Sequence, residues 1–180
     1  MEAGDASLHY SMMNKKITTK IIGLGNPILG DDGVGHRVAD EIARQLEKNN
    51  QFMSQTIQVE KASLGGLSLM ELLIDSDRAI IIDSIETNQN PVGTVRNFNL
   101  DELPDQIYGH TTSSHDTTLS KAIQVGKLIG AHLPEPIFIV SIEAHNLYEF
   151  SERLSPSVEQ AIPKACQSVW QYLEELEKEL

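Results

Sequence analysis

A glycine-rich turn between an apolar strand and a helix is the feature that most constrains how this chain folds. Residues 21–35 read IIGLGNPILGDDGVG, an apolar run followed by a turn rich in glycine. Glycine lets a backbone turn sharply or approach another group closely. Two adjacent carboxylates, Asp31 and Asp32, stand where a helical pattern begins. The stretch predicts a strand–turn–helix unit whose acidic side chains bind a cation or transfer a proton.

Strands and helices are predicted to alternate along the rest of the chain. Apolar runs or alternation predict strands at residues 17–25, 56–62, 78–83 and 136–142, and a marginal strand near a sheet edge at 93–100. Apolar spacings of three and four predict helices at 31–50 and 67–74, a helix carrying Leu119, Ile123 and Leu128, and a closing helix at 156–177. This order calls for a mostly parallel sheet covered on both faces, joined by right-handed crossovers. We expect a three-layer α/β/α domain with about five strands.

The length and the first residues suggest how the chain is divided. The 180 residues suit one domain with a sizeable core, and no linker or low-complexity tract interrupts them. We expect a disordered leader at residues 1–16 and a single α/β domain at 17–180. The leader lacks the apolar core of a secretion signal, and no apolar run approaches the roughly 20 residues that span a bilayer. We therefore expect a cytoplasmic protein without membrane insertion.

Charge and cysteine content exclude several classes of function. With 26 acidic residues, 14 basic residues and a net charge of −12, the chain is ill suited to bind a nucleic-acid backbone. Cys166 is the single cysteine, so neither an intrachain disulfide nor a cysteine metal cluster can form. Pro163 predicts a kink in the early turns of the closing helix. We expect Cys166 to be a buried structural thiol, since it belongs to the apolar stripe Val158, Ile162, Cys166, Val169 and Leu173.

Acidic and imidazole side chains occur where the predicted topology brings chain segments together. Asp31 and Asp32 follow the first strand, Asp83 ends the third, and His115 precedes the helix before the last strand. Ligands of such sheets bind beyond the carboxyl ends of the strands. Two carboxylates and one imidazole suit zinc, nickel, iron or manganese and leave positions open for a substrate. The spacing and topology therefore indicate a candidate metal or catalytic site.

Each of these residues also has a purely structural interpretation. Asp31 at a helix start is expected to be a cap stabilised by free N–H groups and the helix dipole. Asp83 could mark where a buried strand meets water, and His115 could be a polar loop residue. Of the other histidines, we expect His9 in the leader, His36 on an exposed helix face and His132 in a turn. His110 and His145 are expected in loops that could flank the site.

Phosphate binding by the glycine turn is disfavoured. Ile28 stands where a dinucleotide fingerprint needs its third glycine, and no Gly-Lys-Ser or Gly-Lys-Thr follows. The pair Asp31 and Asp32 would repel a phosphate. No nucleophile elbow of a serine hydrolase is present.

Several short motifs occur in a specific order along the chain. They are Gly23-Leu24-Gly25-Asn26 with Asp31-Asp32-Gly33-Val34-Gly35, then Gly65-Gly66, Ile81-Ile82-Asp83, Ser114-His115 and Leu154-Ser155-Pro156. This set resembles the hydrogenase maturation endopeptidases, which process the large subunit of nickel-iron hydrogenases. The resemblance covers nearly everything after Lys16. It implies a twisted five-stranded sheet between helices and a metal-contacting trio at Asp32, Asp83 and His115. The position matched by Asp32 is glutamate in some members.

The resemblance implies a specific reaction. It predicts an aspartic-type endopeptidase, a hydrolase that removes a short C-terminal extension from a hydrogenase large-subunit precursor after nickel insertion. Asp32, Asp83 and His115 would touch nickel already carried by the precursor, so no tightly bound cofactor of the protein's own is expected. The Gly65-Gly66 turn would line the cleft for the tail. The expected partner is the precursor, and the expected state is a monomer.

Two alternatives come from other classes of protein. Gly23-Leu24-Gly25-Asn26-Pro27 also resembles the start of peptidyl-tRNA hydrolase. That enzyme needs a basic surface and a catalytic histidine preceded by Thr-Arg shortly after this motif, whereas the segment here is Ile28-Leu29-Gly30-Asp31-Asp32 in an acidic chain. The other alternative is a non-enzymatic metal-binding assembly module that uses the same trio.

Overall fold

The chain forms an alternating series of strands and helices. The structure, a computed structural model, describes residues 16–48, 55–102 and 116–178, so the leader expected at 1–16 lies outside the described residues except for Lys16. The elements in chain order are β1 (Ile17–Leu24), η1 (Gly30–Gly33), α2 (Val34–Leu46), β2 (Gln55–Ala62), α3 (Gly66–Leu73), β3 (Arg78–Ile85), β4 (Val95–Asn99), η2 (Leu100–Glu102), α4 (Asp116–Leu128), β5 (Ile137–Glu143) and α5 (Pro156–Lys178).

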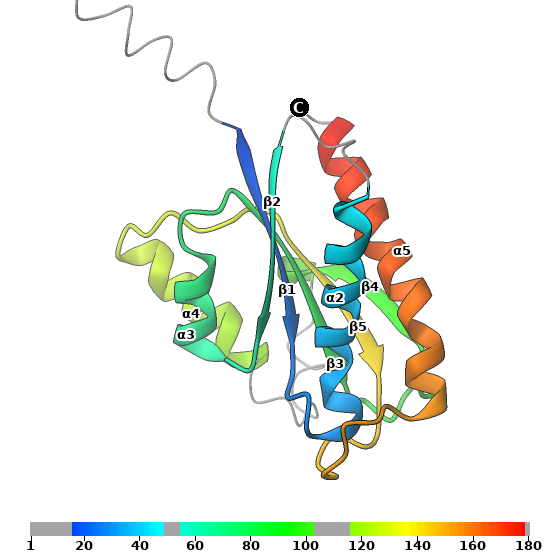
Figure 1. Cartoon of the computed structure of the whole chain (residues 1–180). Coiled ribbons are helices and arrows are strands. Elements are labelled where there is room, and N and C mark those ends of the chain that lie inside the picture. The colour runs from blue at the N-terminus through cyan, green and yellow to red at the C-terminus, as the bar shows by residue number, and fades with distance from the viewer. Residues whose placement is uncertain (1–15, 49–54, 103–115, 179–180) are drawn as a thin grey trace, which may run out of the picture.

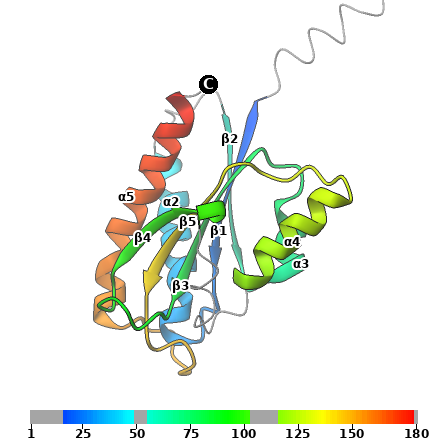
Figure 2. The ribbon, with the colours of Figure 1, turned by 180° about the vertical axis from the view of Figure 1, so that it is seen from behind.

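The five strands form one sheet with the order β2-β1-β3-β5-β4. All neighbouring pairs are parallel except β4, which pairs antiparallel with β5 at the edge of the sheet. Helices α2 and α5 cover one face, and α3 and α4 cover the other (Figures 1 and 2). The predicted three-layer α/β/α fold is confirmed. The marginal strand predicted at 93–100 is also confirmed, as the edge strand β4.

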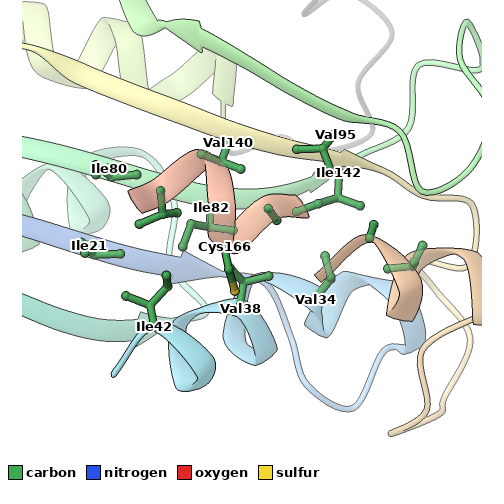
Figure 3. Packing of buried hydrophobic residues seen from close by; sticks show 14 of the residues in the cluster. Ile21, Val34, Val38, Ile42, Ile80, Ile82, Val95, Val140, Ile142 and Cys166 are labelled. Atoms are coloured by element: carbon green, nitrogen blue, oxygen red, sulfur yellow. The ribbon is translucent and has the colours of Figure 1, made fainter. Parts of the chain in front are cut away.

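Each face of the sheet carries its own apolar core. Ile80 and Ile82 of β3 belong to the cluster under α2 and α5, whereas Ala79 and Ile81 belong to the cluster under α3 and α4. A strand with a core on both sides must be apolar at successive positions, which explains the continuous apolar run of β3. Figure 3 shows the first cluster, in which Cys166 points from α5 toward the side chains of α2 and the sheet.

The apolar residues expected on the helices lie on helices in the structure. Cys166 is buried as predicted. Leu119 and Ile123 of α4 are buried, whereas Leu128, the last residue of α4, is 86% exposed. A step of five residues from Ile123 turns the helix by about 140°, which carries Leu128 away from the core. Pro163 lies inside α5. No helix in the described part of the chain has the length and apolar character that crossing a bilayer requires.

Two glycines allow α2 to pack directly against the sheet. A Cβ atom at Gly23 would lie 2.3 Å from the carbonyl oxygen of Gly35, and a Cβ at Gly35 would lie 2.1 Å from that of Leu24. No side chain can occupy these positions without moving the backbone. The helix predicted from Asp31 begins as the short 3-10 turn η1 and becomes α-helical at Val34.

Candidate functional site

Asp32 and Asp83 both lie near the carboxyl ends of the strands, where Ser84 contacts each of them. Asp32 lies in η1, directly after β1, and Asp83 lies near the end of β3. Ser84 joins them, because its hydroxyl donates to Asp32 Oδ1 at 3.1 Å and its backbone N–H donates to Asp83 Oδ1 at 2.9 Å. Two carboxylates separated by 51 positions in the chain thus contact the same residue, Ser84.

The glycine turn fixes the position of Asp32. The backbone N–H of Asn26 donates to Asp32 Oδ2 at 2.7 Å, so both carboxylate oxygens accept a hydrogen bond. Gly25 has a φ of +122°, and a Cβ there would lie 1.8 Å from the carbonyl oxygen of Asp32. Only glycine lets the turn close this tightly. The turn therefore holds the Asp32 carboxylate in one orientation, near the carboxyl ends of the strands.

Asp83 is almost completely buried. Its exposed fraction is 5%, so it does not mark the point where β3 meets water, which was the structural alternative. Because side chains alternate along a strand, Asp83 faces the same side of the sheet as Ile81, the side covered by α3 and α4. Placing a carboxylate in such surroundings is costly unless polar groups compensate it, and the N–H of Ser84 is one such group.

The third predicted site residue, His115, lies outside the described residues. It immediately precedes α4, whose first turn lies toward the carboxyl ends of the strands (Figures 1 and 2). That helix covers the face toward which Asp83 points. Among the described residues alone, no group of three His, Cys, Asp or Glu side chains is arranged to hold a metal ion. The participation of His115 therefore stays a prediction.

Asp31 has a different role from the one predicted. It is 1% exposed, and its two oxygens accept hydrogen bonds from the backbone N–H and the hydroxyl of Ser155, at 2.6 and 2.9 Å. The residue at the N-cap position of η1 is Leu29, which makes no side-chain capping bond. The expectation that Asp31 caps its own helix is wrong, because the carboxylate turns inward and binds the residue that precedes α5.

The segment between β5 and α5 runs along the glycine turn. The N–H of Gly30 donates to the carbonyl oxygen of Ser151 at 2.6 Å, and the N–H of Ser151 donates to that of Ile28 at 3.1 Å. The N–H of Asp31 donates to the carbonyl oxygen of Asn146 at 3.0 Å. Together with the Asp31–Ser155 contact, these bonds join the first motif of the sequence to the last one. Sequence reasoning treated Leu154-Ser155-Pro156 only as a helix start and missed this connection.

Three histidines outside the predicted trio are described. His36 is half-buried, with Nε2 3.2 Å from the carbonyl oxygen of Ala62, so the expectation that it lies on an exposed helix face is wrong. His132 is exposed beside Asp77, as expected for a turn. His145 follows β5, with Nδ1 3.6 Å from an oxygen of Glu86, at the same edge as the carboxylates. His9 and His110 lie outside the described residues.

Glu143, at the end of β5, is a buried acidic residue that sequence reasoning missed. It is 0% exposed, and its carboxylate accepts the backbone N–H and hydroxyl of Thr87 and the backbone N–H of Asn88. These three bonds hold the loop that follows β3. Glu143 is therefore accounted for by the support it gives to this loop.

Two hollows in the described surface lie away from the carboxylates. Their volumes are about 520 and 440 Å³, they lie along α2 and α5, and Arg37 and Ile162 line both. Cys166 lines the first of them, but burial, with a smaller contribution from Glu41, raises the pKa of its thiol to about 11. The thiol is neutral at physiological pH, so Cys166 is not an activated nucleophile.

Solved structures with a similar fold include two hydrogenase maturation proteases. The hydrogenase maturating endopeptidase HybD from E. coli has a TM-score of 0.69 at 24% identity, over 88% of this chain and 93% of that chain. The [NiFe] hydrogenase maturation protease HybD from Thermococcus kodakarensis has a TM-score of 0.65 at 19% identity, over 87% and 99%. At these identities the likeness shows the fold: a five-stranded α/β/α domain of the HybD type.

The family itself is shown by sequence. The model of the HycI hydrogenase maturation protease family matches residues 37–172. The HupD hydrogenase expression/formation proteins of Thiocapsa roseopersicina and Rhizobium leguminosarum bv. viciae are 22% and 24% identical over 85% and 82% of this chain. The aligned segments span 66% and 70% of those two proteins. The chain belongs to the hydrogenase maturation protease family, a family of hydrolases, which sets aside the peptidyl-tRNA hydrolase alternative.

Proposed function

We propose that this protein is an endopeptidase that removes a short C-terminal extension from the nickel-loaded precursor of a nickel-iron hydrogenase large subunit. Family membership supports the reaction class. The observation that carries the assignment of the site is the contact of Ser84 with both Asp32 and Asp83 at the carboxyl edge of the sheet. Acidic oxygens fixed at this edge suit a substrate that carries a divalent metal.

Nickel enters this proposal as part of the substrate. Asp32, Asp83 and His115 would contact the nickel held by the precursor, so the metal reports that cofactor loading is complete. A carboxylate oxygen offers two acceptor positions. Within the described part of the chain, Asp32 accepts one hydrogen bond on each oxygen, which leaves a second acceptor position on each for a metal. The protein needs no tightly bound metal of its own.

Hydrolysis of the peptide bond requires a water molecule and a group that takes its proton. A carboxylate of the pair can act as general base, accepting a proton from water as the oxygen attacks the scissile carbonyl, and the proton then passes to the leaving amine. A divalent ion in the substrate can also polarise that carbonyl. The aspartic-type assignment rests on the first route. The expected setting is the cytoplasm, with the protein as a monomer and the precursor as its partner.

The test compares nickel-loaded and nickel-free precursor. Each is incubated with the purified protein, and mass spectrometry measures loss of the C-terminal tail. We expect the wild type to remove the tail from the nickel-loaded precursor alone. The His115→Ala variant should remove no tail, although its circular dichroism spectrum is unchanged. Equal cleavage of both precursors would contradict recognition of nickel. Binding of the loaded precursor without loss of the tail would instead favour the non-enzymatic assembly module.

A further inference from the structure

Ser84 is the residue that connects the two carboxylates. Its hydroxyl and its backbone N–H donate to different aspartates, at 3.1 Å to Asp32 Oδ1 and at 2.9 Å to Asp83 Oδ1. No feature of the sequence had assigned it a role. Because successive side chains of a strand point to opposite faces, its hydroxyl lies on the side of α2 while Asp83 faces the side of α4. Ser84 therefore links groups that approach the site from both faces of the sheet.

The Ser84 hydroxyl is held against Asp32. The residue is 2% exposed, and its hydroxyl donates to Asp32 Oδ1 at 3.1 Å. The role that this contact gives Ser84 is to orient Asp32. Together with the N–H of Asn26 on the other oxygen, the hydroxyl fixes both ends of that carboxylate. A carboxylate held at both oxygens cannot rotate about its Cβ–Cγ bond without breaking at least one of the two bonds.

We propose that Ser84 is a positioning residue that sets the orientation of the Asp32 carboxylate relative to Asp83. Removing the hydrogen-bond partner of a side chain that contacts a metal typically lowers metal affinity or activity by about 10–100-fold. Ser84→Ala therefore lowers kcat for tail removal by about 10–100-fold. This effect on catalysis rests on the proposed function, whereas the effect on Asp32 does not.

The chain offers a closely matched control in Ser76. It is 0% exposed, and its hydroxyl donates to the backbone carbonyl of Leu73 at 2.6 Å, just before the opposite end of β3. Ser76→Ala removes one buried hydroxyl and one hydrogen bond without touching a carboxylate. Ser84→Thr restores a hydroxyl on a β-branched side chain, which a strand accommodates. Comparing the three variants separates a general loss of protein stability from a loss of orientation of the Asp32 carboxylate.

Two measurements test the proposal. In steady-state cleavage of the nickel-loaded precursor, Ser84→Ala loses kcat, Ser84→Thr regains most of it, and Ser76→Ala behaves as the wild type. In ¹H–¹⁵N spectra of the protein alone, the amide resonance of Asn26 moves in Ser84→Ala, because the two residues are joined through the Asp32 carboxylate, and does not move in Ser76→Ala. An unmoved Asn26 resonance would overturn the proposal whether or not the protein cleaves the precursor. Equal kcat for Ser84→Ala and Ser76→Ala would overturn its catalytic part, and an inactive wild type would refute the proposed function instead.

Discussion

The contact between Asp31 and Ser155 should contribute strongly to stability, because it is buried and charged. Asp31 is 1% exposed and accepts two hydrogen bonds from Ser155, at 2.6 and 2.9 Å. Hydrogen bonds to charged groups contribute about 1.5–3 kcal/mol each. Removing the carboxylate also removes the cost of burying it, so we count the lower value, about 1.5 kcal/mol, for each of the two hydrogen bonds. We expect Asp31→Ala to lower the free energy of unfolding by about 3 kcal/mol.

Urea unfolding followed by circular dichroism measures this loss as a change in midpoint at constant slope. Ser155→Ala removes only the hydroxyl donor and should cost about 1.5 kcal/mol, and the double variant should show a coupling energy of at least about 1 kcal/mol. The matched control is Asp40→Ala on α2, an exposed aspartate paired with Lys61 at 2.6 Å, which should cost about 0.5 kcal/mol or less. A loss for Asp31→Ala no larger than that of Asp40→Ala would refute the reasoning.

Two further predictions concern the packing of α2 and the state of the thiol. Gly35→Ala places a methyl group 2.1 Å from the carbonyl oxygen of Leu24 and should destabilise the protein by about 3 kcal/mol or more, so an unchanged melting temperature would contradict the close approach of α2 to the sheet. Iodoacetamide at pH 8 should modify Cys166 far more slowly in the native than in the unfolded protein, as followed by mass spectrometry, and equal rates would show that the thiol is accessible and ionised. Because the folded-state pKa of Cys166 is raised from 9.0 to about 11, its contribution to stability is fully present below pH 9 and is lost as pH rises toward 11.

The sequence predicts most of the fold because the periodicity of its apolar residues is local information. The continuous apolar run of β3 requires a core on both faces, and the structure has one on each. The weaker pattern of β4 follows from its place at the sheet edge, where it has one neighbouring strand. Boundaries are less predictable: the helix predicted from residue 31 begins as the 3-10 turn η1 and becomes α-helical only at Val34.

The partners of polar side chains are much harder to predict than the elements that carry them. Asp31 and Ser155 are 124 positions apart, and Asp32 and Ser84 are 52 apart. No local pattern distinguishes an acidic residue that caps its own helix from one that binds a distant serine. The sequence therefore places Asp32 and Asp83 near the carboxyl ends of two strands, but nothing in it indicates that Ser84 contacts both or that Asp31 binds Ser155.

The most direct test of the site compares Asp32→Asn with Asp40→Asn in cleavage of the nickel-loaded precursor. Both substitutions remove one charge in or near α2, but only Asp32 belongs to the carboxylate pair held by Ser84. If Asp32 acts at the site, Asp32→Asn loses more than about 100-fold in kcat, beyond the usual effect of removing a supporting residue, and keeps the circular dichroism spectrum of the wild type. Asp40→Asn should cleave as fast as the wild type. Wild-type cleavage by Asp32→Asn would contradict the assignment of the site.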